Sequence, residues 1–417
     1  MTQEIRHNLT RGPVHRPAVE LSQRTAMQLL DCEDYKNGLC RSCSSIEQPL
    51  DSQLTAKDLR ARGLIHAQEW LDPVTSVKEA FRNKVKLVVT GSVRQPKLGI
   101  LGSDGVGVDL ADCPLPSAGI RTVIETLRAF ITRAGLEPYS PATNRGTLKY
   151  VIIVEAPSGE LMVRFVARRR GVQGILFKLR KELEAAMPNM AVLSLNVQSE
   201  RKAVIEGEEE IVISERATLP MRLWVGQTWD EYPVDLFLRP KSFFQTNTDI
   251  AEALYSRAIQ WCGDVDSAWD LYCGVGGFLL ALASAAKRSG RDFSGIGVET
   301  SQEAVDAGCA GADAIGMGGA VRFICADATA WASQEGSAPT SLPQLVVVNP
   351  PRRGIGELAQ WLEGSGVQRV LYSSCNVNSL AKDLAAMPSY SVVKAQVLDM
   401  FPHTAHFETI VLLERVS

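Results

Sequence analysis

Hydrophobic and polar residues follow one another differently before and after residue 236. Beyond it, short apolar runs of strand length alternate with amphipathic stretches of helical length, which is typical of a parallel sheet covered by helices. The predicted strands cover residues 267–272, 294–299, 321–326, 345–348, 370–372 and 410–413, and two predicted helices cover residues 249–262 and 279–287. We therefore predict that residues 236–417 form an α/β domain.

The middle of the chain, residues 76–235, has the pattern of a sheet with one or two helices. Its predicted elements are a hairpin over 149–155 and 161–166, helices over 119–136 and 175–187, and a strand over 192–197. Cations cluster near the end of the hairpin, at Arg164, Arg168, Arg169 and Arg170. This α+β domain is thus expected to have a basic face, which is either ordinary solvated surface or a phosphate contact.

Composition narrows the class of protein. With 417 residues, of which 45% are hydrophobic and 22% charged, the chain is long enough for two or three globular domains. No apolar run reaches the length of about 18 residues that a membrane-spanning helix needs. The first residues, Met1 to Arg6, lack the apolar core of a secretory signal, so we expect a cytoplasmic protein. The net charge of −3 gives no overall attraction to nucleic acid, so a polyanion site must be a local basic patch.

Cysteines are concentrated after a weakly patterned lead-in over residues 1–31. Cys32, Cys40 and Cys43 have the spacing C-x7-C-x2-C, and Cys113, followed by a proline, is the candidate fourth ligand. In a reducing compartment such a set indicates a metal site rather than disulfides. Four thiolates can hold zinc or an iron–sulfur cluster. The single, distant fourth cysteine differs from the paired CxxC motifs of zinc ribbons, and therefore favours an iron–sulfur cluster without excluding zinc.

A glycine-rich turn follows the predicted strand 267–272. The run Cys273-Gly274-Val275-Gly276-Gly277-Phe278 leads into a helix, and such glycines let the backbone approach a nucleotide-type cofactor closely. The spacing G-x-G-G differs from the G-x-G-x-x-G dinucleotide fingerprint, which argues against NAD. Glu299 ends the next strand and can bind ribose hydroxyls, while Asp327 ends another and can meet an adenine amino group. Together with the stiff loop Asn349-Pro350-Pro351-Arg352, this order is that of a Rossmann-like domain that binds S-adenosylmethionine.

A thiol and a carboxylate accompany the last predicted strands. Ser373 and Ser374 end the strand around Leu371 and deliver Cys375 to its carboxyl end, the edge of α/β sheets at which ligands bind. Glu408 precedes the apolar run 410–413. Such a pair indicates a nucleophile with a general base. The alternative is that Cys375 is a small core residue, the usual state of a free cysteine.

With these motifs in this order, the chain resembles the RNA uracil-C5-methyltransferase family from about residue 30 to the C-terminus. The four cysteines look like the [4Fe–4S] site of its ribosomal branch. The 31 residues before Cys32 are too few for the small β-barrel TRAM module of some members, so the chain is most similar to bacterial 23S rRNA methyltransferases that lack it. The matching motifs are Ser242-Phe243-Phe244-Gln245-Thr246-Asn247, Asp270-Leu271-Tyr272-Cys273-Gly274, Asn349-Pro350-Pro351-Arg352, Ser373-Ser374-Cys375-Asn376 and His406-Phe407-Glu408-Thr409.

This resemblance implies a reaction and a set of sites. Cys375 would add to C6 of a uracil, C5 would then take the methyl group of S-adenosylmethionine, and Glu408 would remove the C5 proton. The implied cofactor residues are Gln245, Tyr272, Gly277, Glu299, Asp327 and Asn349, and the implied ligands of a [4Fe–4S] cluster are Cys32, Cys40, Cys43 and Cys113. Phe243, Phe244 and Arg352 are candidates for lining the pocket of the flipped base. The implied partner is a single-stranded or loop uridine of 23S rRNA; we expect a monomer and no membrane contact.

Three units follow from the patterns and the resemblance together. They are residues 1–75 with three cluster cysteines, a central β-rich RNA-binding domain over 76–235 with the fourth, and the catalytic domain over 236–417. Two positions depart from the family's pattern: Asn349 stands where many members have aspartate, and Gly277, often asparagine, can contact the cofactor only through its backbone. The cysteine spacing also differs from the C-x3-C-x2-C of radical S-adenosylmethionine enzymes, so we expect a structural or RNA-orienting cluster.

Other functions are compatible with parts of this pattern. A tRNA uracil-C5-methyltransferase would use the same chemistry, but the tRNA-specific bacterial branch lacks the cysteine set. A non-catalytic iron–sulfur RNA-binding protein with a degenerate methyltransferase fold would not need Cys375 and Glu408. A small-molecule methyltransferase would leave the basic central domain without a purpose.

Overall fold

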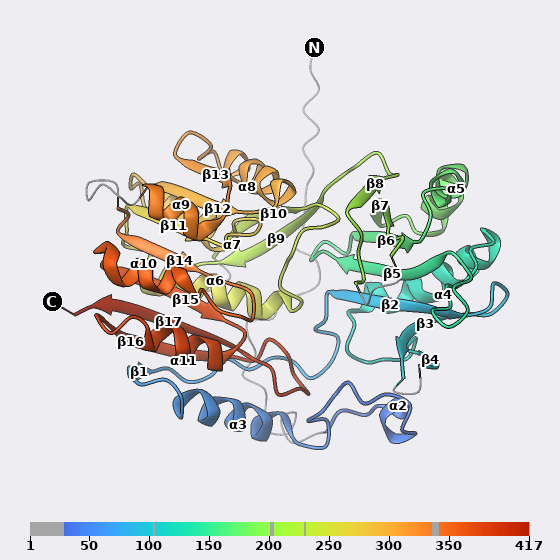
Figure 1. Cartoon of the computed structure of the whole chain (residues 1–417), viewed down its shortest axis with the longest axis horizontal. Coiled ribbons are helices and arrows are strands. Elements are labelled where there is room, and N and C mark those ends of the chain that lie inside the picture. Colours follow the sequence, from blue (N-terminus) through green and yellow to red (C-terminus); the bar gives the residue numbers. More distant parts are fainter. Residues whose placement is uncertain (1–28, 103–104, 201–203, 229–230, 336–341, 417) are drawn as a thin grey trace, which may run out of the picture.

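The computed structural model describes residues 29–102, 105–200, 204–228, 231–335 and 342–416. The predicted lead-in falls almost entirely on residues 1–28, and the signal-peptide interpretation does so completely; both therefore lie outside the described residues. Within the described part of the chain, the strands form two sheets and a separate hairpin, and the sheets lie side by side in two lobes (Figure 1). The predicted mixed α/β fold is confirmed.

The C-terminal sheet has the strand order β1-β16-β17-β15-β14-β11-β12-β13. Neighbours from β13 to β15 run parallel, whereas β17 runs antiparallel to both β15 and β16. The direction of the strand order reverses between β11 and β14, and in open α/β sheets such a point opens a crevice at the carboxyl ends. The strands are β1 (Ala67–Trp70), β11 (Ser267–Leu271), β12 (Ser294–Glu299), β13 (Val321–Cys325), β14 (Leu345–Val348), β15 (Arg369–Ser374), β16 (Tyr390–Leu398) and β17 (Glu408–Arg415).

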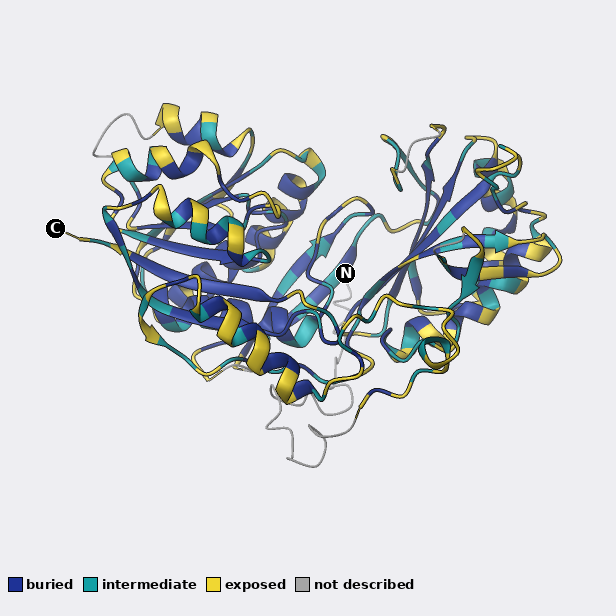
Figure 2. Ribbon diagram, turned by 60° about the horizontal axis from the view of Figure 1, so that its bottom comes forward, coloured by how far each residue is buried: buried dark blue, intermediate teal, exposed yellow. Residues whose placement is uncertain are grey.

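Helices cover both faces of this sheet. Leu345 and Val347 pack in one core with α6, α7 and α8, whereas Val346 and Val348 pack in a second core with α9, α10 and α11. Strands buried on both faces have continuous apolar sequences, which is why they could be predicted. Figure 2 shows these strands buried between helices whose outer faces are exposed. The helices are α6 (Thr248–Cys262), α7 (Gly277–Arg288), α8 (Gln302–Ala314), α9 (Ala328–Glu335), α10 (Glu357–Ser365) and α11 (Val377–Ala385).

The central sheet has the strand order β4-β3-β2-β5-β6-β7-β8 and carries α4 and α5 on one face. The predicted hairpin is confirmed as the antiparallel pair β5 and β6. A second hairpin, β9 and β10, packs in the same core as α6 and α7 and so joins the two lobes. The elements are β2 (Lys84–Gly91), β3 (Pro96–Leu101), β4 (Gly107–Asp109), α4 (Ala118–Arg133), β5 (Leu148–Glu155), β6 (Leu161–Ala167), α5 (Val172–Ala186), β7 (Met190–Val197), β8 (Glu209–Val212), β9 (Leu219–Val225) and β10 (Tyr232–Leu238).

One member of the predicted basic cluster is not on the surface. Arg164 lies within β6 and is only 1% exposed. Its guanidinium forms ion pairs with Glu206 at 2.8 Å and with Glu210 at 2.6 Å. The interpretation of Arg164 as part of a basic face was therefore wrong, because carboxylates more than 40 residues away in sequence enclose it.

The N-terminal segment contacts both lobes. Its helices are α2 (Glu33–Lys36) and α3 (Leu50–Arg62). Leu30 and Ile46 pack with Phe81 and Leu115 near the central sheet, whereas Leu54 of α3 packs in a core of the C-terminal sheet. The following strand β1 extends that sheet by pairing parallel to β16, and α3 lies along the bottom of Figure 1 beneath it. The division into units at residues 75 and 235 stays a prediction.

Among the helices of the described ranges, none is long and apolar enough to cross a bilayer.

Candidate active site and cysteine cavity

Strand pairing brings the predicted nucleophile and base to one edge of the C-terminal sheet. Ser374, the last residue of β15, lies opposite Thr409, the second residue of the antiparallel strand β17. Cys375 therefore leaves the sheet where Glu408 enters it. The side chain of the next residue, Asn376, caps α11 by accepting a hydrogen bond from the backbone of Asn378. The backbone at Cys375 is thus held between a strand and a helix start.

Glu408 is buried and has neutral hydrogen-bond donors around it. Glu408 is 1% exposed. Its Oε1 accepts one hydrogen bond from Ser373 Oγ and another from Asn349 Nδ2, the latter at 3.2 Å. Burial raises the pKa of Glu408 to about 7, although the two hydrogen bonds oppose the shift. A carboxyl group with that pKa can accept a proton near neutral pH, as a general base must.

The thiol of Cys375 is half-buried. Burial and the nearby Glu408 carboxylate raise its pKa, and the Arg352 guanidinium opposes this. Arg352 belongs to the loop after β14 and is held on both sides: its carbonyl accepts a hydrogen bond from Asn376 Nδ2 at 2.9 Å, and its Nη2 lies 3.0 Å from His406 Nδ1. The loops after β14 and β15 and before β17 therefore form one connected site.

The glycine turn after β11 has the backbone geometry of a cofactor loop. Tyr272 has a left-handed conformation with φ of 71°, and its backbone N–H donates to Val298 O at 3.0 Å, which ties the turn to β12. Gly277 begins α7 directly beneath the Tyr255 ring; a Cβ atom there would lie 2.4 Å from that ring. A side chain at this position would require the Tyr255 ring to shift, and Gly277 itself can contact a ligand only through its backbone.

Three of the other predicted cofactor residues lie at strand ends, and the fourth lies in the loop before α6. Glu299 links two loops, because its Oε2 accepts from Gly274 N at 3.2 Å and its Oε1 accepts from Thr300 N at 2.8 Å. Asp327 follows β13 and its Oδ1 accepts from Ala330 N at 2.9 Å at the start of α9. Asn349 follows β14, and its Nδ2 is engaged with Glu408 and with Ser373 O. Gln245 lies in the loop before α6, where Asn83 Nδ2 donates to its carbonyl at 3.0 Å.

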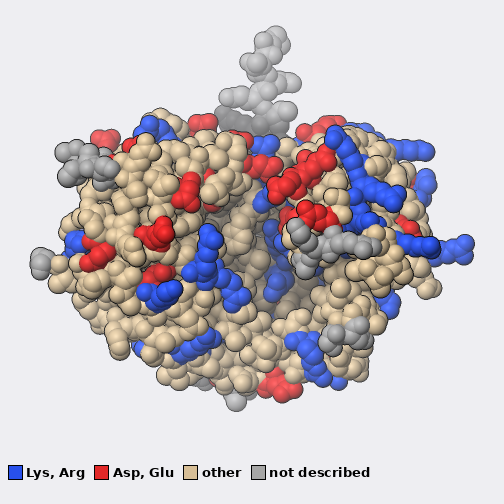
Figure 3. Space-filling view, in the orientation of Figure 1, with Lys and Arg blue, Asp and Glu red and all other residues tan. Residues whose placement is uncertain are grey.

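Two predicted residues of the base pocket differ sharply in exposure. Phe243 is 66% exposed, whereas Phe244 is 4% exposed and packs in the core with α6. The exposed Phe243 ring is available for stacking, and Phe244 supports the loop from beneath. Figure 3 shows a hollow between the two lobes with Lys and Arg side chains along its sides. Arg352 and Arg353, in the loop after β14, are exposed and are local cations of the kind that a polyanion site needs. Lys86 on β2 is also exposed, but its ammonium pairs with Glu206 at 2.7 Å.

Two polar residues of the site had no predicted role. Ser373 is fully buried yet donates to Glu408, and Asp270 is fully buried at the end of β11. Burial raises the pKa of Asp270 to about 7, and its Oδ2 accepts from Leu279 N at 3.3 Å in the first turn of α7. A polar side chain inside an otherwise apolar strand was the available signal in both cases.

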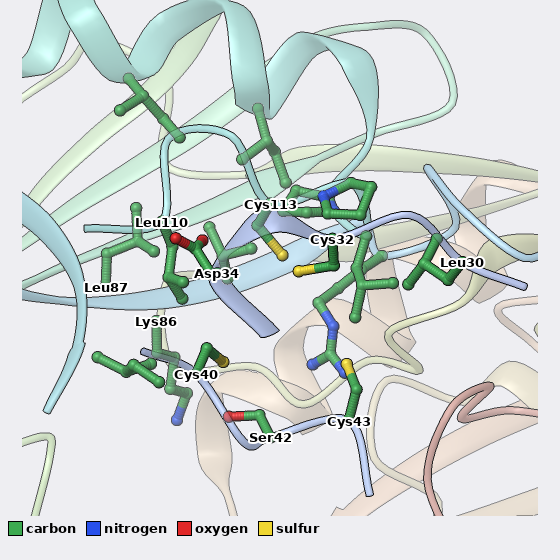
Figure 4. A pocket seen from close by; sticks show the side chains of 18 residues that line it. Leu30, Cys32, Asp34, Cys40, Ser42, Cys43, Lys86, Leu87, Leu110 and Cys113 are labelled. Atoms are coloured by element: carbon green, nitrogen blue, oxygen red, sulfur yellow. The ribbon is translucent and has the colours of Figure 1, made fainter. Parts of the chain in front are cut away.

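The four predicted cluster cysteines line one cavity of about 190 Å³ between the N-terminal segment and the central sheet. Figure 4 shows their sulfur atoms facing a common space. Burial and the neighbouring thiols raise the pKa of Cys43 to about 12, and burial also raises that of Cys113. Arg82 lines the same cavity and acts electrostatically on Cys113 and Cys43. In the described ranges, no group of three or more His, Cys, Asp or Glu residues is arranged to hold a metal ion.

The chain is similar to known proteins over most of its length. Residues 341–416 match the family model described as tRNA (Uracil-5-)-methyltransferase. The chain is 41% identical to the 23S rRNA (uracil(747)-C(5))-methyltransferase RlmC of Yersinia enterocolitica, covering 92% of this chain and 99% of that protein. It is 42% identical to the RlmC of Pectobacterium carotovorum, covering 93% and 100%.

A solved structure supports the fold. The crystal structure of Pyrococcus abyssi tRNA (uracil-54, C5)-methyltransferase in complex with S-adenosyl-L-homocysteine matches with a TM-score of 0.72 at 23% identity, covering 90% of this chain and 84% of that one. The predicted Rossmann-like methyltransferase fold is thereby confirmed.

Proposed function

The chain belongs to the RNA uracil-C5-methyltransferase family, and from this premise we propose that it methylates C5 of a specific uridine in 23S rRNA, with S-adenosylmethionine as the methyl donor. The observation that carries the proposal is the meeting of Cys375 and Glu408 at the paired ends of β15 and β17. A sequence similarity over nearly the whole length of rRNA-modifying relatives makes the ribosomal substrate the first choice.

The proposed chemistry assigns one role to each group. Uracil C5 is a poor nucleophile, so the Cys375 thiolate first adds to C6 and gives C5 enolate character. S-adenosylmethionine would supply an electrophilic methyl group: C5 takes this methyl group, and the electron pair of the broken S–CH3 bond stays on sulfur, which gives S-adenosylhomocysteine. The covalent intermediate then carries both a methyl group and a proton at C5. Glu408 removes that proton, the C5–C6 double bond re-forms, and the Cys375 thiolate is expelled.

The surroundings of Glu408 support its role as the base. It must be ionised when the C5 proton becomes acidic, and it must then hold that proton while the thiolate leaves. A pKa of about 7 suits both requirements near neutral pH. In this proposal Arg352 and Phe243 contact the target nucleotide, which has to leave its stack or loop to reach the site.

We further propose that Gln245, Tyr272, Gly277, Glu299, Asp327 and Asn349 contact S-adenosylmethionine. Five of them follow or end β11 to β14 or begin α7, at the edge where ligands of α/β sheets bind. Glu299 and Asp327 offer carboxylates for ribose and adenine, and Gly277 offers only its backbone N–H at a helix start. Asn349 has its amide nitrogen engaged with Glu408, so its carbonyl oxygen is the atom left for the cofactor or base.

The four cysteines would hold a [4Fe–4S] cluster. Four thiols around a shared cavity provide the donor set of such a cluster, and the single, distant fourth cysteine favours it over zinc. The raised pKa of the thiol of Cys43 fits the need for a bound metal to stabilise the thiolates. The monomeric state and the cytoplasmic location remain parts of this proposal.

The direct test is tritium release from 23S rRNA labelled at uridine C5, with S-adenosylmethionine, for the wild type and Cys375→Ala. Release by the wild type alone is expected. Release from labelled tRNA but not from 23S rRNA would transfer the same chemistry to a tRNA substrate. No release from either RNA, with an intact cluster absorption spectrum, would favour a non-catalytic RNA-binding protein.

A further inference from the structure

The loop that delivers Glu408 is held by a distant part of the chain. Residues 399–407 connect β16 to β17, immediately before Glu408, and include His406, which contacts Arg352. Most contacts that hold the first half of this loop come from residues 45–57, the segment that follows the cysteine loop, and the carbonyls of Val74 and Lys78 add two more. This N-terminal clamp, as we define residues 45–57, has no role in the proposed chemistry.

A buried ion pair anchors the start of the loop. Lys57 Nζ of α3 lies 2.6 Å from Asp399 Oδ1, with the two side chains 4% and 1% exposed. The same ammonium donates to Phe401 O at 3.1 Å. A pair without solvent around it keeps its geometry, because moving either charge leaves the other buried and unpaired.

His403 anchors the middle of the loop. It has a left-handed backbone conformation with φ of 64°, which a residue other than glycine adopts only when its surroundings hold it there. Its N–H donates to Gln53 Oε1 at 2.8 Å, its carbonyl accepts from Ser45 N at 2.9 Å, and its ring Nε2 lies 2.5 Å from Lys78 O. Backbone and ring are therefore both fixed by residues more than 300 positions earlier.

We propose that the N-terminal clamp is a positioning element for catalysis: it holds loop 399–407 so that Glu408 is aligned with the C5 proton and His406 with Arg352. The inference rests on the proposed function. The clamp begins two residues after Cys43, and its contacts reach Asp399, Phe401 and His403 in the loop that precedes Glu408.

A displaced base affects one step more than the others. Addition of Cys375 and methyl transfer precede the removal of the C5 proton, so misalignment of Glu408 makes the methylated covalent adduct accumulate. A simple loss of folded protein would lower adduct and product together. The adduct, seen as RNA that migrates with protein on a denaturing gel, therefore separates positioning from stability.

The experiment compares full-length, cluster-loaded variants. Gln53→Ala removes a contact to His403, and Lys57→Met combined with Asp399→Asn neutralises the buried pair without leaving a single charge. Leu59→Ala, on the exposed face of the same helix, is the matched control. Glu408→Gln defines the adduct level when the base is absent. Hydrogen exchange of residues 399–407 is measured in each variant without RNA.

We expect Gln53→Ala and the double variant to exchange faster in the loop, to turn over about tenfold to a hundredfold more slowly, and to accumulate adduct toward the Glu408→Gln level. Leu59→Ala should match the wild type in all three measurements. Wild-type exchange and an unchanged adduct fraction in both clamp variants would overturn the inference. If Glu408→Gln forms no adduct, the proposed role of Glu408 as the base fails. The hydrogen-exchange rates of residues 399–407 still decide, in that case, whether the clamp orders the loop.

Discussion

Glu408 and Arg164 are both charged side chains buried in a sheet, each 1% exposed, but their surroundings differ. Arg164 faces two carboxylates, and these partners keep it charged. Glu408 faces a hydroxyl and an amide, and no salt bridge to it is found among the described residues. Its pKa therefore rises to about 7, whereas Glu206 beside Arg164 has its pKa lowered to about 2 despite partial burial.

In the proposed mechanism, this difference separates the structural charge of Arg164 from the reactive charge of Glu408. An opposite charge stabilises one protonation state over the whole physiological range of pH, which suits a group that only holds strands together. Neutral donors orient a carboxylate without locking its protonation state. The central sheet thus uses its buried charge for stability, and the C-terminal sheet keeps one that can accept a proton.

The largest effect on turnover is expected when the carboxylate of Glu408 is removed. Glu408→Gln keeps the shape and loses the base, so turnover should fall by on the order of a hundredfold to ten-thousandfold. Tritium release under single-turnover conditions measures this loss. Turnover within threefold of the wild type would show that another group takes the C5 proton.

Removing the buried cation of Arg164 should lower the stability of the fold and leave turnover unchanged. Arg164→Met leaves Glu210 without its cation and Glu206 paired with Lys86 alone, and should lower the free energy of unfolding by about 3–5 kcal/mol. Urea unfolding measures the change. Turnover per folded molecule should stay near the wild-type value at a temperature at which the variant is folded, and a selective loss of turnover would contradict the comparison.

Glu408 should also reduce stability above its pKa. Folding raises its pKa from the ordinary 4.5 to about 7, so the penalty on the folded state grows as pH rises through this range and is complete above it. Glu408→Gln is therefore expected to raise the free energy of unfolding by about 1–3 kcal/mol at pH 8 and by less at pH 5. Equal gains at both pH values would show that the carboxyl group does not titrate in this way.

A second carboxylate beside Glu408 should shift its titration. Asn349→Asp replaces a donor 3.2 Å from Glu408 Oε1 by a like charge, and the two acids then share a proton. Because the base must be ionised, the acidic limb of the pH–rate profile should move upward by about 1 unit or more. The Kd for S-adenosylmethionine is measured in parallel, since Asn349 is also a proposed cofactor contact.

The smallest effect is expected at Ser373. Ser373→Ala removes one hydrogen bond to the ionised form of Glu408 and should shift the acidic limb in the same direction as Asn349→Asp, but by less than 1 unit. Ser374→Ala is the control, because Ser374 bonds to the backbone of Asn376 rather than to Glu408. A downward shift in Ser373→Ala would contradict the assigned hydrogen bond.

Much of the fold was predictable because burial leaves a pattern in the sequence. The strand at 345–348 is apolar throughout since both of its faces are covered, and α4 was predicted over 119–136 from one apolar face and found at Ala118–Arg133. Helix α3 gave no such signal: its sequence is mostly polar, and the buried side chains of Gln53 and Lys57 find their partners more than 300 residues later.

For the candidate site, the residue types, the order of the motifs and the loops that carry them came from the sequence alone, because strand ends and glycine turns are local features. What required the tertiary structure was each residue's environment. Ser373 looked like a strand terminator until pairing of β15 with β17 placed it against Glu408, and Arg164 looked like a surface cation until Glu206 and Glu210 enclosed it. Chemistry depends on which groups surround a charge, and that neighbourhood is assembled only when distant strands pair.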